Sequence, residues 1–210
     1  MNKLVVWFVL IAVAVIAVVS AYWALDLRWR PRTITKNQAE IVALLEQSGW
    51  VSPGLDGPRL YMVGFRDCPG CAAFKKDALP KLVEAGVETR VIEFARRDRN
   101  GLEQSTAAER ATVAELWINR SWTLMQRWDA SPVEAWTAQG IAPADGDMAR
   151  TAVVNAGRDM VDKLEPLLKA NGVSAGTPIL VWWSKDGVMH GCSCGSEAGY
   201  RHALKDFGAK

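Results

Sequence analysis

The sequence predicts an α/β fold: a mixed β-sheet with a helical insertion, preceded by one N-terminal transmembrane helix. Residues 59–65 and 88–94 are apolar runs separated by a helical pattern, which is typical of parallel strands joined by a crossover helix. Residues 179–183 and 188–190 flank a turn at 185–187 and predict an antiparallel hairpin in the same sheet. Between these strands, residues 103–172 carry helical spacing and no strand signal, which defines the insertion.

The segment before the first strand, residues 28–58, predicts a linker and a leading helix. Residues 31–36 form a short polar linker, and residues 37–48 place Ile41, Leu44 and Leu45 on one helical face. Gly49 ends this helix, and the prolines and glycines of residues 51–58 predict a loop. The compact domain then covers residues 59–210.

The remaining helices are predicted from apolar spacing. One runs from Cys71 to Gly86 with a kink at Pro80, and the last covers residues 197–207. The insertion contains four helical patterns, at residues 107–119, 121–130, 132–139 and 147–171. Because bulky aromatic residues dominate small cores, its tryptophans predict a core that belongs to the insertion itself: Trp117, Trp122, Trp128 and Trp136.

Two cysteines separated by Pro69 and Gly70 stand between the first strand and the next helix. Cys68 falls at the N-terminus of that helix, where unpaired N–H groups and the helix dipole favour a thiolate. Half of a zinc site and a structural disulfide remain alternatives, but the strand-to-helix context favours redox chemistry. Arg66 and Lys75 would assist ionisation of Cys68, whereas Asp67 would oppose it.

Residues 4–25 form an almost unbroken apolar run, interrupted only by Ser20. About 20 apolar residues cross the hydrocarbon core of a bilayer. Aromatic residues stand where they would anchor such a helix at the membrane interface: Trp7, Tyr22, Trp23 and Trp29. We therefore expect residues 1–27 to be a retained membrane anchor, with a signal peptide cleaved near residues 19–21 as the alternative.

Two features of the sequence give opposing predictions of the membrane topology. Arg28, Arg30 and Arg32 follow the apolar run, and the positive-inside rule would keep the folded domain in the cytoplasm. The even set of four cysteines favours an oxidising compartment. Following the cysteines, we expect a single-pass inner-membrane protein in contact with the lipid bilayer, with its catalytic domain in the periplasm. The net charge of +2, with both signs interspersed, excludes nucleic acid as a partner.

Residues 59–207 resemble the thioredoxin superfamily and, within it, the catalytic domains of the disulfide isomerase-like proteins DsbC and DsbG. The resemblance rests on three segments: residues 65–86 with their internal proline, the helical insertion, and the Gly-Thr-Pro-Ile sequence at 176–179. It implies that Cys68 is the nucleophile and Cys71 the resolving thiol. It also implies that Thr177 and Pro178 form a cis-proline loop that binds an extended substrate segment, with Gly191 in the same groove.

This resemblance implies a membrane-anchored thiol-disulfide oxidoreductase of the reductase or isomerase type, with no cofactor and no metal. Its partners would be disulfide-containing or unfolded proteins, and a membrane redox partner that resets the pair. Two features depart from the family. Residues 37–57 are too short for the dimerisation domain of DsbC and DsbG, and Met62 stands where thioredoxins carry a buried carboxylate. Proton transfer to the resolving thiol would then use water or another group.

Cys192 and Cys194 form a second pair at the end of the returning strand. In the thioredoxin topology this position lies beside the cis-proline loop, so we expect the two pairs to be neighbours. A disulfide across a single residue is strained and a comparatively good oxidant, which suits a redox relay or a second redox centre; a static disulfide or two unreactive thiols are the alternatives. Two other functional classes remain open. One is copper or zinc binding by the four cysteines with His190, and the other is a non-catalytic thioredoxin-fold component of an envelope or secretion assembly.

Overall fold

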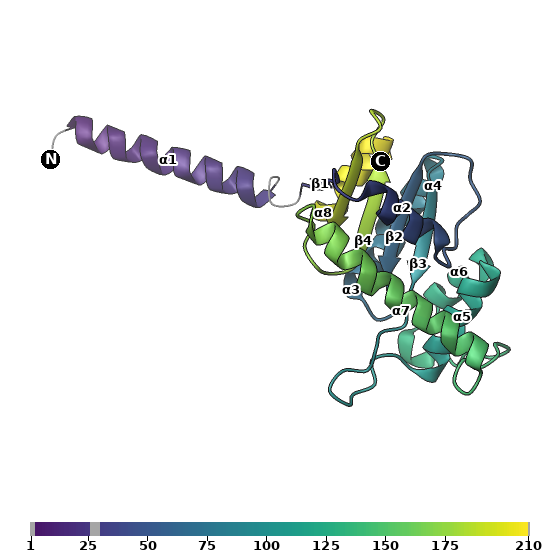
Figure 1. Cartoon of the computed structure of the whole chain (residues 1–210). Coiled ribbons are helices and arrows are strands. Elements are labelled where there is room, and N and C mark those ends of the chain that lie inside the picture. The colour runs from purple at the N-terminus through teal and green to yellow at the C-terminus, as the bar shows by residue number, and fades with distance from the viewer. Residues whose placement is uncertain (1–2, 26–29, 210) are drawn as a thin grey trace. The chain divides into compact units, whose positions relative to one another are not determined.

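The computed structural model describes residues 3–25 and 30–209, and its chain divides into two units, Met1–Arg30 and Pro31–Lys210 (Figure 1). The first unit contains helix α1 (Lys3–Leu25). Trp29 and Arg28, expected to flank a membrane anchor, lie outside the described residues.

The expected membrane span is corrected by the structure. A bilayer crossing needs a helix that combines sufficient length with a sufficiently apolar composition. Within the described residues, no helix meets both requirements. The expectation of a single-pass inner-membrane protein with a lipid-embedded segment is therefore wrong.

The second unit is built on a five-stranded mixed sheet. Its strands are β1 (Arg32–Thr33), β2 (Arg59–Gly64), β3 (Glu88–Glu93), β4 (Ile179–Trp183) and β5 (Met189–Ser193), in the order β1-β5-β4-β2-β3. Strands β2 and β3 are parallel, and the other neighbouring pairs are antiparallel. This confirms the predicted mixed α/β sheet with its terminal hairpin.

Strand β1 corrects the expectation that residues 31–36 are only a polar linker. Arg32 pairs with Gly191, and Thr33 pairs with His190. The next residue, Ile34, is fully buried, and a Cβ atom at Gly191 would lie only 2.8 Å from its Cδ1 atom. The missing side chain at position 191 thus lets this segment close the edge of the sheet.

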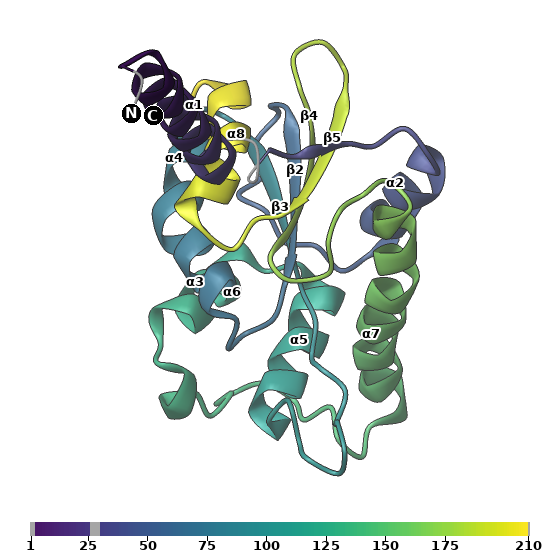
Figure 2. The same ribbon diagram turned by 90° about the vertical axis from the view of Figure 1, so that its left-hand side faces the viewer.

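Helices cover both faces of the sheet (Figure 2). Because side chains alternate along a strand, Leu60 and Met62 of β2 enter one core, and Tyr61 and Val63 enter the other. The first core lies under α3 (Pro69–Ala73), α4 (Leu79–Glu84) and α8 (Glu197–Phe207). The second lies under α2 (Gln38–Gln47) and α7 (Met148–Lys169).

The helix that follows the first cysteine pair is interrupted by a π-helical turn, Phe74–Ala78, between α3 and α4. In this turn the N–H of Leu79 bonds to the carbonyl of Phe74, five residues earlier. Pro80 has no N–H and its ring would crowd an ordinary helical turn, so a local widening accommodates it. The helix is thus interrupted just before Pro80, the residue at which the sequence predicts a kink.

The insertion contains α5 (Ala107–Asn119) and α6 (Trp122–Ala130) before α7. The helix expected at 132–139 is wrong, because only a short 3₁₀ turn, Val133–Ala135, forms there. Positive φ angles at Ala138 (54°) and Gly140 (79°) are incompatible with a continuing right-handed helix.

The tryptophans of the insertion do not form a core of their own. Trp128 is fully buried in the same cluster as Met62 and Cys68. Trp117 donates its indole N–H to the carbonyl of Glu93, at a distance of 2.8 Å. The insertion therefore extends the core of the sheet instead of forming an independent one.

Candidate redox site

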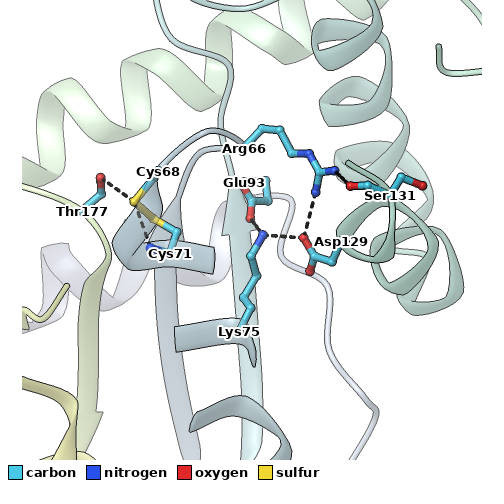
Figure 3. A network of polar contacts seen from close by, with 8 residues as sticks. All are labelled: Arg66, Cys68, Cys71, Lys75, Glu93, Asp129, Ser131 and Thr177. Carbon is cyan, nitrogen blue, oxygen red and sulfur yellow. Dashed lines mark hydrogen bonds and ion pairs between the residues drawn. A yellow bond between two sulfur atoms is a disulfide. The ribbon is translucent and has the colours of Figure 1, made fainter. Parts of the chain in front are cut away.

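Cys68 and Cys71 form a disulfide at the N-terminus of α3, immediately beyond β2 (Figure 3). Their Cα atoms are 5.2 Å apart. Cys68 is the N-cap residue and retains 3 % of its surface exposed, whereas Cys71 is fully buried. Of the two cysteines, only Cys68 contacts solvent. Its exposed fraction is far smaller than that of a freely accessible thiol.

Two donors point at the sulfur of Cys68. The backbone N–H of Cys71 lies 3.0 Å from it, and the hydroxyl of Thr177 lies 3.3 Å from it. The Thr177–Pro178 peptide bond is cis, as expected. The structure therefore brings together the pair at 68 and 71 and the loop at 177 and 178.

Glycines make the close packing around this disulfide possible. A Cβ atom at Gly64 would lie 2.7 Å from the sulfur of Cys71. A Cβ atom at Gly70 would lie 2.7 Å from the Cα of Gly195 and 3.1 Å from the Cδ of Pro178. Gly195 was missed in the sequence, although its position directly after the second cysteine pair was a usable signal.

Cys192 and Cys194 form the second disulfide, at the end of the hairpin strand β5. Cys192 pairs with Leu180 across the hairpin, and the N–H of Cys194 donates to the carbonyl of Pro178 at 2.9 Å. Both disulfides belong to one core cluster. The structure thus places the second pair beside the cis-proline loop.

Gly191 is placed differently from the other candidate residues. The space beside its Cα is filled by Ile34 and Val173, whose side chains belong to the core under α2 and α7. Cys68 and Cys71 belong to the core on the other face of the sheet. Gly191 therefore packs against Ile34 and Val173 and does not face the Cys68–Cys71 disulfide.

A buried ionic network lies beside α3 (Figure 3). The ammonium of Lys75 lies 2.8 Å from Glu93 and 2.6 Å from Asp129. Arg66 pairs with Asp129 at 3.4 Å and donates to the carbonyl of Ser131. The two cations expected to assist Cys68 are thus engaged with carboxylates of β3 and α6.

Ion pairs with two carboxylates determine the direction in which the pKa of Lys75 shifts. Burial by itself lowers the pKa of this ammonium, but Glu93 and Asp129 offset that effect, so its pKa lies above the ordinary value. The side chain of Glu93 is only 1 % exposed. Its second oxygen, Oε2, has no hydrogen-bond partner within the described part of the chain.

Register places Glu93 next to the disulfide. Glu93 is the neighbour of Gly64 across the parallel pair β2 and β3, and paired residues face the same side of a sheet. That side of Gly64 is occupied by the sulfur of Cys71. Sequence reasoning missed Glu93 and Asp129, since each reaches the site only through a neighbouring element.

A second set of charged residues includes Asp67, the residue before Cys68. Arg96 donates hydrogen bonds to both carboxylate oxygens of Asp67, at 2.6 and 2.5 Å. Glu109 of α5 is buried, and burial, followed by the charges of Asp67 and Glu93, raises its pKa to about 7. Glu109 therefore titrates near neutral pH.

The metal-binding alternative finds no support in the geometry. Among residues 3–25 and 30–209, no three side chains of the His, Cys, Asp and Glu types come together as a metal-binding group. The four cysteines are paired as disulfides, in which sulfur is not a thiolate ligand. His190 packs its ring 5.5 Å from that of Trp182.

A mixed sheet whose β2 strand leads into a cysteine pair at a helix N-terminus, opposite a cis-proline loop, defines a thioredoxin-like fold. Solved structures that share it include two of ScsC from Proteus mirabilis. The catalytic domain of Proteus mirabilis ScsC is 16 % identical, with a TM-score of 0.50, over 81 % of this chain and 94 % of that one. A variant of P. mirabilis ScsC with a deletion in its linker is 17 % identical, with a TM-score of 0.52, over 98 % and 92 %.

No protein-family model matches the sequence, and no curated protein matches it either. At identities below one fifth, the likeness to the ScsC structures establishes the fold alone. It does not distinguish a DsbC or DsbG type from other proteins with this fold.

Proposed function

We propose that this protein is a thiol-disulfide oxidoreductase of the reductase or isomerase type. Cys68 is its nucleophile and Cys71 its resolving thiol. The observation that carries the proposal is the sulfur of Cys68, which caps a helix and accepts hydrogen bonds from Cys71 and Thr177. The similar structure described as a catalytic domain, from P. mirabilis ScsC, supports it through the shared fold.

The same donors stabilise a thiolate when the pair is reduced. Hydrogen bonds to an ionised sulfur and the positive end of the helix both favour the charged form, which lowers the pKa of the thiol. Pro69 and Gly70 add no charge of their own. Because Arg66 and Lys75 are paired with carboxylates, the helix N-terminus and Thr177 supply most of the stabilisation.

The reaction has two steps. The Cys68 thiolate attacks a substrate disulfide, forms a mixed disulfide and releases one substrate thiolate, which takes a proton from water. In the reductase direction, the Cys71 thiolate then attacks the sulfur of Cys68 and releases the second substrate thiol. This leaves the Cys68–Cys71 disulfide seen in the structure. In the isomerase direction, another substrate thiol attacks first, and the pair stays reduced.

Cys71 is fully buried, so the proton that it loses before attack needs an acceptor inside the protein. Met62 offers none. We assign this role to Glu93, which shares the face of Gly64 on which Cys71 packs and has one oxygen without a hydrogen-bond partner among the described residues. A carboxylate within hydrogen-bond reach of a reacting group, directly or through one water, is suited to such a transfer.

Substrates are disulfide-containing or unfolded proteins. An extended segment would pair with the backbone at Thr177 as an added strand, beside the sulfur of Cys68. A cavity of about 430 Å³ lies between the helix that carries the cysteine pair and the residues at the end of α6. Its lining includes Ala72 and Val133, and it offers apolar surface for a substrate side chain. A second redox protein would return electrons to the pair after each reductive turnover.

The test measures insulin reduction and refolding of scrambled ribonuclease by the full chain. Cys68→Ser should abolish both activities, and Cys71→Ser should accumulate a mixed disulfide with the substrate. Ala39→Ser is the matched control, because Ala39 is exposed on α2, over the other face of the sheet, and the change should leave both activities unchanged. Equal activity of Cys68→Ser and the wild type would contradict the proposal and favour a non-catalytic role.

A further inference from the structure

We propose that Cys192–Cys194 is a second redox site, which exchanges its disulfide with Cys68–Cys71 inside the same chain. The inference rests on the proposed function of the first pair. In this scheme the partner of the second pair is Cys68–Cys71 of the same chain. When reduced, the second pair stores two further electrons.

The two pairs meet through their neighbouring glycines. Gly70 lies between Cys68 and Cys71, and Gly195 directly follows Cys194. A Cβ atom at Gly70 would lie 2.7 Å from the Cα and 3.0 Å from the carbonyl oxygen of Gly195. The absence of a side chain at both positions lets the two cysteine segments touch through their backbones.

Pro178 is the second link between the pairs. Its Cδ atom lies 3.1 Å from the Cβ position of Gly70 and 3.8 Å from that of Gly195. Its carbonyl accepts the hydrogen bond of Cys194 at 2.9 Å. The preceding residue, Thr177, bonds to the sulfur of Cys68. One loop therefore contacts the sulfur of Cys68 and the backbone of Cys194.

Both pairs lie in the same part of the core. Cys68 is 3 % exposed, Cys192 8 % and Cys194 1 %. All four cysteines belong to the same core cluster. A static disulfide would need no such proximity to a reactive pair, whereas exchange requires it.

The exchange is balanced within the chain. The Cys68 thiolate attacks a sulfur of the Cys192–Cys194 disulfide, forming a mixed disulfide and releasing the other cysteine as a thiolate. The Cys71 thiolate then attacks the sulfur of Cys68, which restores the Cys68–Cys71 disulfide and releases the second thiolate. Two electrons pass to Cys192 and Cys194, and the two protons of the first pair follow them. The reverse sequence reloads the first pair after it has reduced a substrate.

Counting disulfides in a single turnover tests the proposal. The full chain is reduced, freed of reductant, and mixed with excess insulin; the reaction is quenched with acid, and the thiols on the separated insulin chains are counted. The wild type should reduce two disulfides per chain, and Cys192→Ser/Cys194→Ser should reduce one. One disulfide for both chains would overturn the proposal, and would leave the second pair as a structural disulfide.

Cys68→Ser separates internal exchange from direct action of the second pair. It should reduce no insulin, because Cys192 and Cys194 reach the substrate only through Cys68. If this variant still reduces one disulfide per chain, the internal route is wrong. Failure of the proposed function itself gives a different result, since the wild type would then reduce none.

A trapped intermediate gives an independent measurement if the double variant does not fold. In Cys71→Ser, with Cys192–Cys194 oxidised, Cys68 can attack but Cys71 no longer completes the transfer, so the mixed disulfide persists in equilibrium with the starting disulfide. Acid quenching, alkylation and tryptic digestion should yield residues 67–75 linked by a disulfide to residues 186–201. Complete recovery of an alkylated Cys68 with an intact Cys192–Cys194 disulfide would overturn the proposal.

Discussion

The hydroxyl of Thr177 donates a hydrogen bond to the sulfur of Cys68, which lies 109 positions earlier in the chain. The sheet creates this contact. Strand β4 begins at Ile179, which pairs antiparallel with Val63 near the end of β2. The loop before β4 and the residues after β2 therefore meet at one end of the sheet, and the contact can be tested through the acidity of the thiol.

Thr177→Val should raise the pKa of the Cys68 thiol. The valine keeps the shape of the side chain and removes the hydrogen bond that favours the thiolate, with an expected shift of about one unit. The rate of iodoacetamide alkylation against pH measures it, in a Cys71→Ala background that isolates the Cys68 thiol. Thr177→Ser keeps a hydroxyl and is the control. An unchanged titration in Thr177→Val would show that the hydroxyl does not interact with the thiolate.

Glu93→Gln should slow the second step of the reaction. The amide retains the size of the side chain but does not accept the proton of Cys71, so the mixed disulfide with substrate should persist at least about 10-fold longer. Quenched-flow sampling of the mixed disulfide measures this lifetime. Asp129→Asn neutralises the other carboxylate that contacts Lys75 and is the matched control. Equal lifetimes for the two variants would exclude the assignment of Glu93.

Lys75→Met should destabilise the fold because it leaves the carboxylate of Glu93 buried without a cation. Removing one partner of a buried pair costs about 3–5 kcal/mol, which urea unfolding would resolve. Arg97→Met provides the comparison, since Arg97 and Asp159 are about half exposed and such pairs contribute at most about 1 kcal/mol. Lys75→Met/Glu93→Leu should recover part of the loss. Equal losses for Lys75→Met and Arg97→Met would mean that burial does not matter at this pair.

Gly70→Ala should loosen the contact between the two cysteine segments. The added methyl group meets the backbone of Gly195, which cannot rotate away as a side chain would. We expect a loss of about 1–3 kcal/mol in unfolding free energy, together with slower insulin reduction. Ala39→Ser, on the exposed side of α2, should change neither quantity. A fully stable and active Gly70→Ala would show that the two segments separate freely.

Glu109 should make stability depend on pH. Its pKa is raised to about 7 from an unfolded value near 4.5, so the folded chain holds a proton that the unfolded chain has lost. The resulting stabilisation is fully present below pH 4.5 and is lost as pH rises through 7. Glu109→Gln should therefore be neutral at pH 4 and more stable than the wild type by about 1–3 kcal/mol at pH 8. Parallel unfolding midpoints for both chains across this range would contradict the prediction.

Local patterns in the sequence predicted most of the sheet and its connections. The apolar runs at 59–65, 88–94 and 179–183 correspond to β2, β3 and β4, and Pro80 marks an interrupted helix. Apolar periodicity gave the wrong secondary structure where the conformation depends on residues far away in the sequence. Residues 31–36 contain a short strand because Gly191 leaves room for Ile34, and residues 132–139 turn where backbone angles leave the helical region. The membrane span expected from composition was not upheld.

The sequence by itself determined the chemistry of the site: two cysteines at a strand-to-helix junction, a Thr-Pro turn before a later strand, and a second cysteine pair. These features depend on spacing along the chain. Only the tertiary structure decided which groups surround the sulfurs, because Glu93 comes to the face of Cys71 through the register of two strands and Asp129 arrives through the packing of α6. It also joined Gly70 to Gly195, since backbones come into contact only where the folded chain leaves no side chain between them.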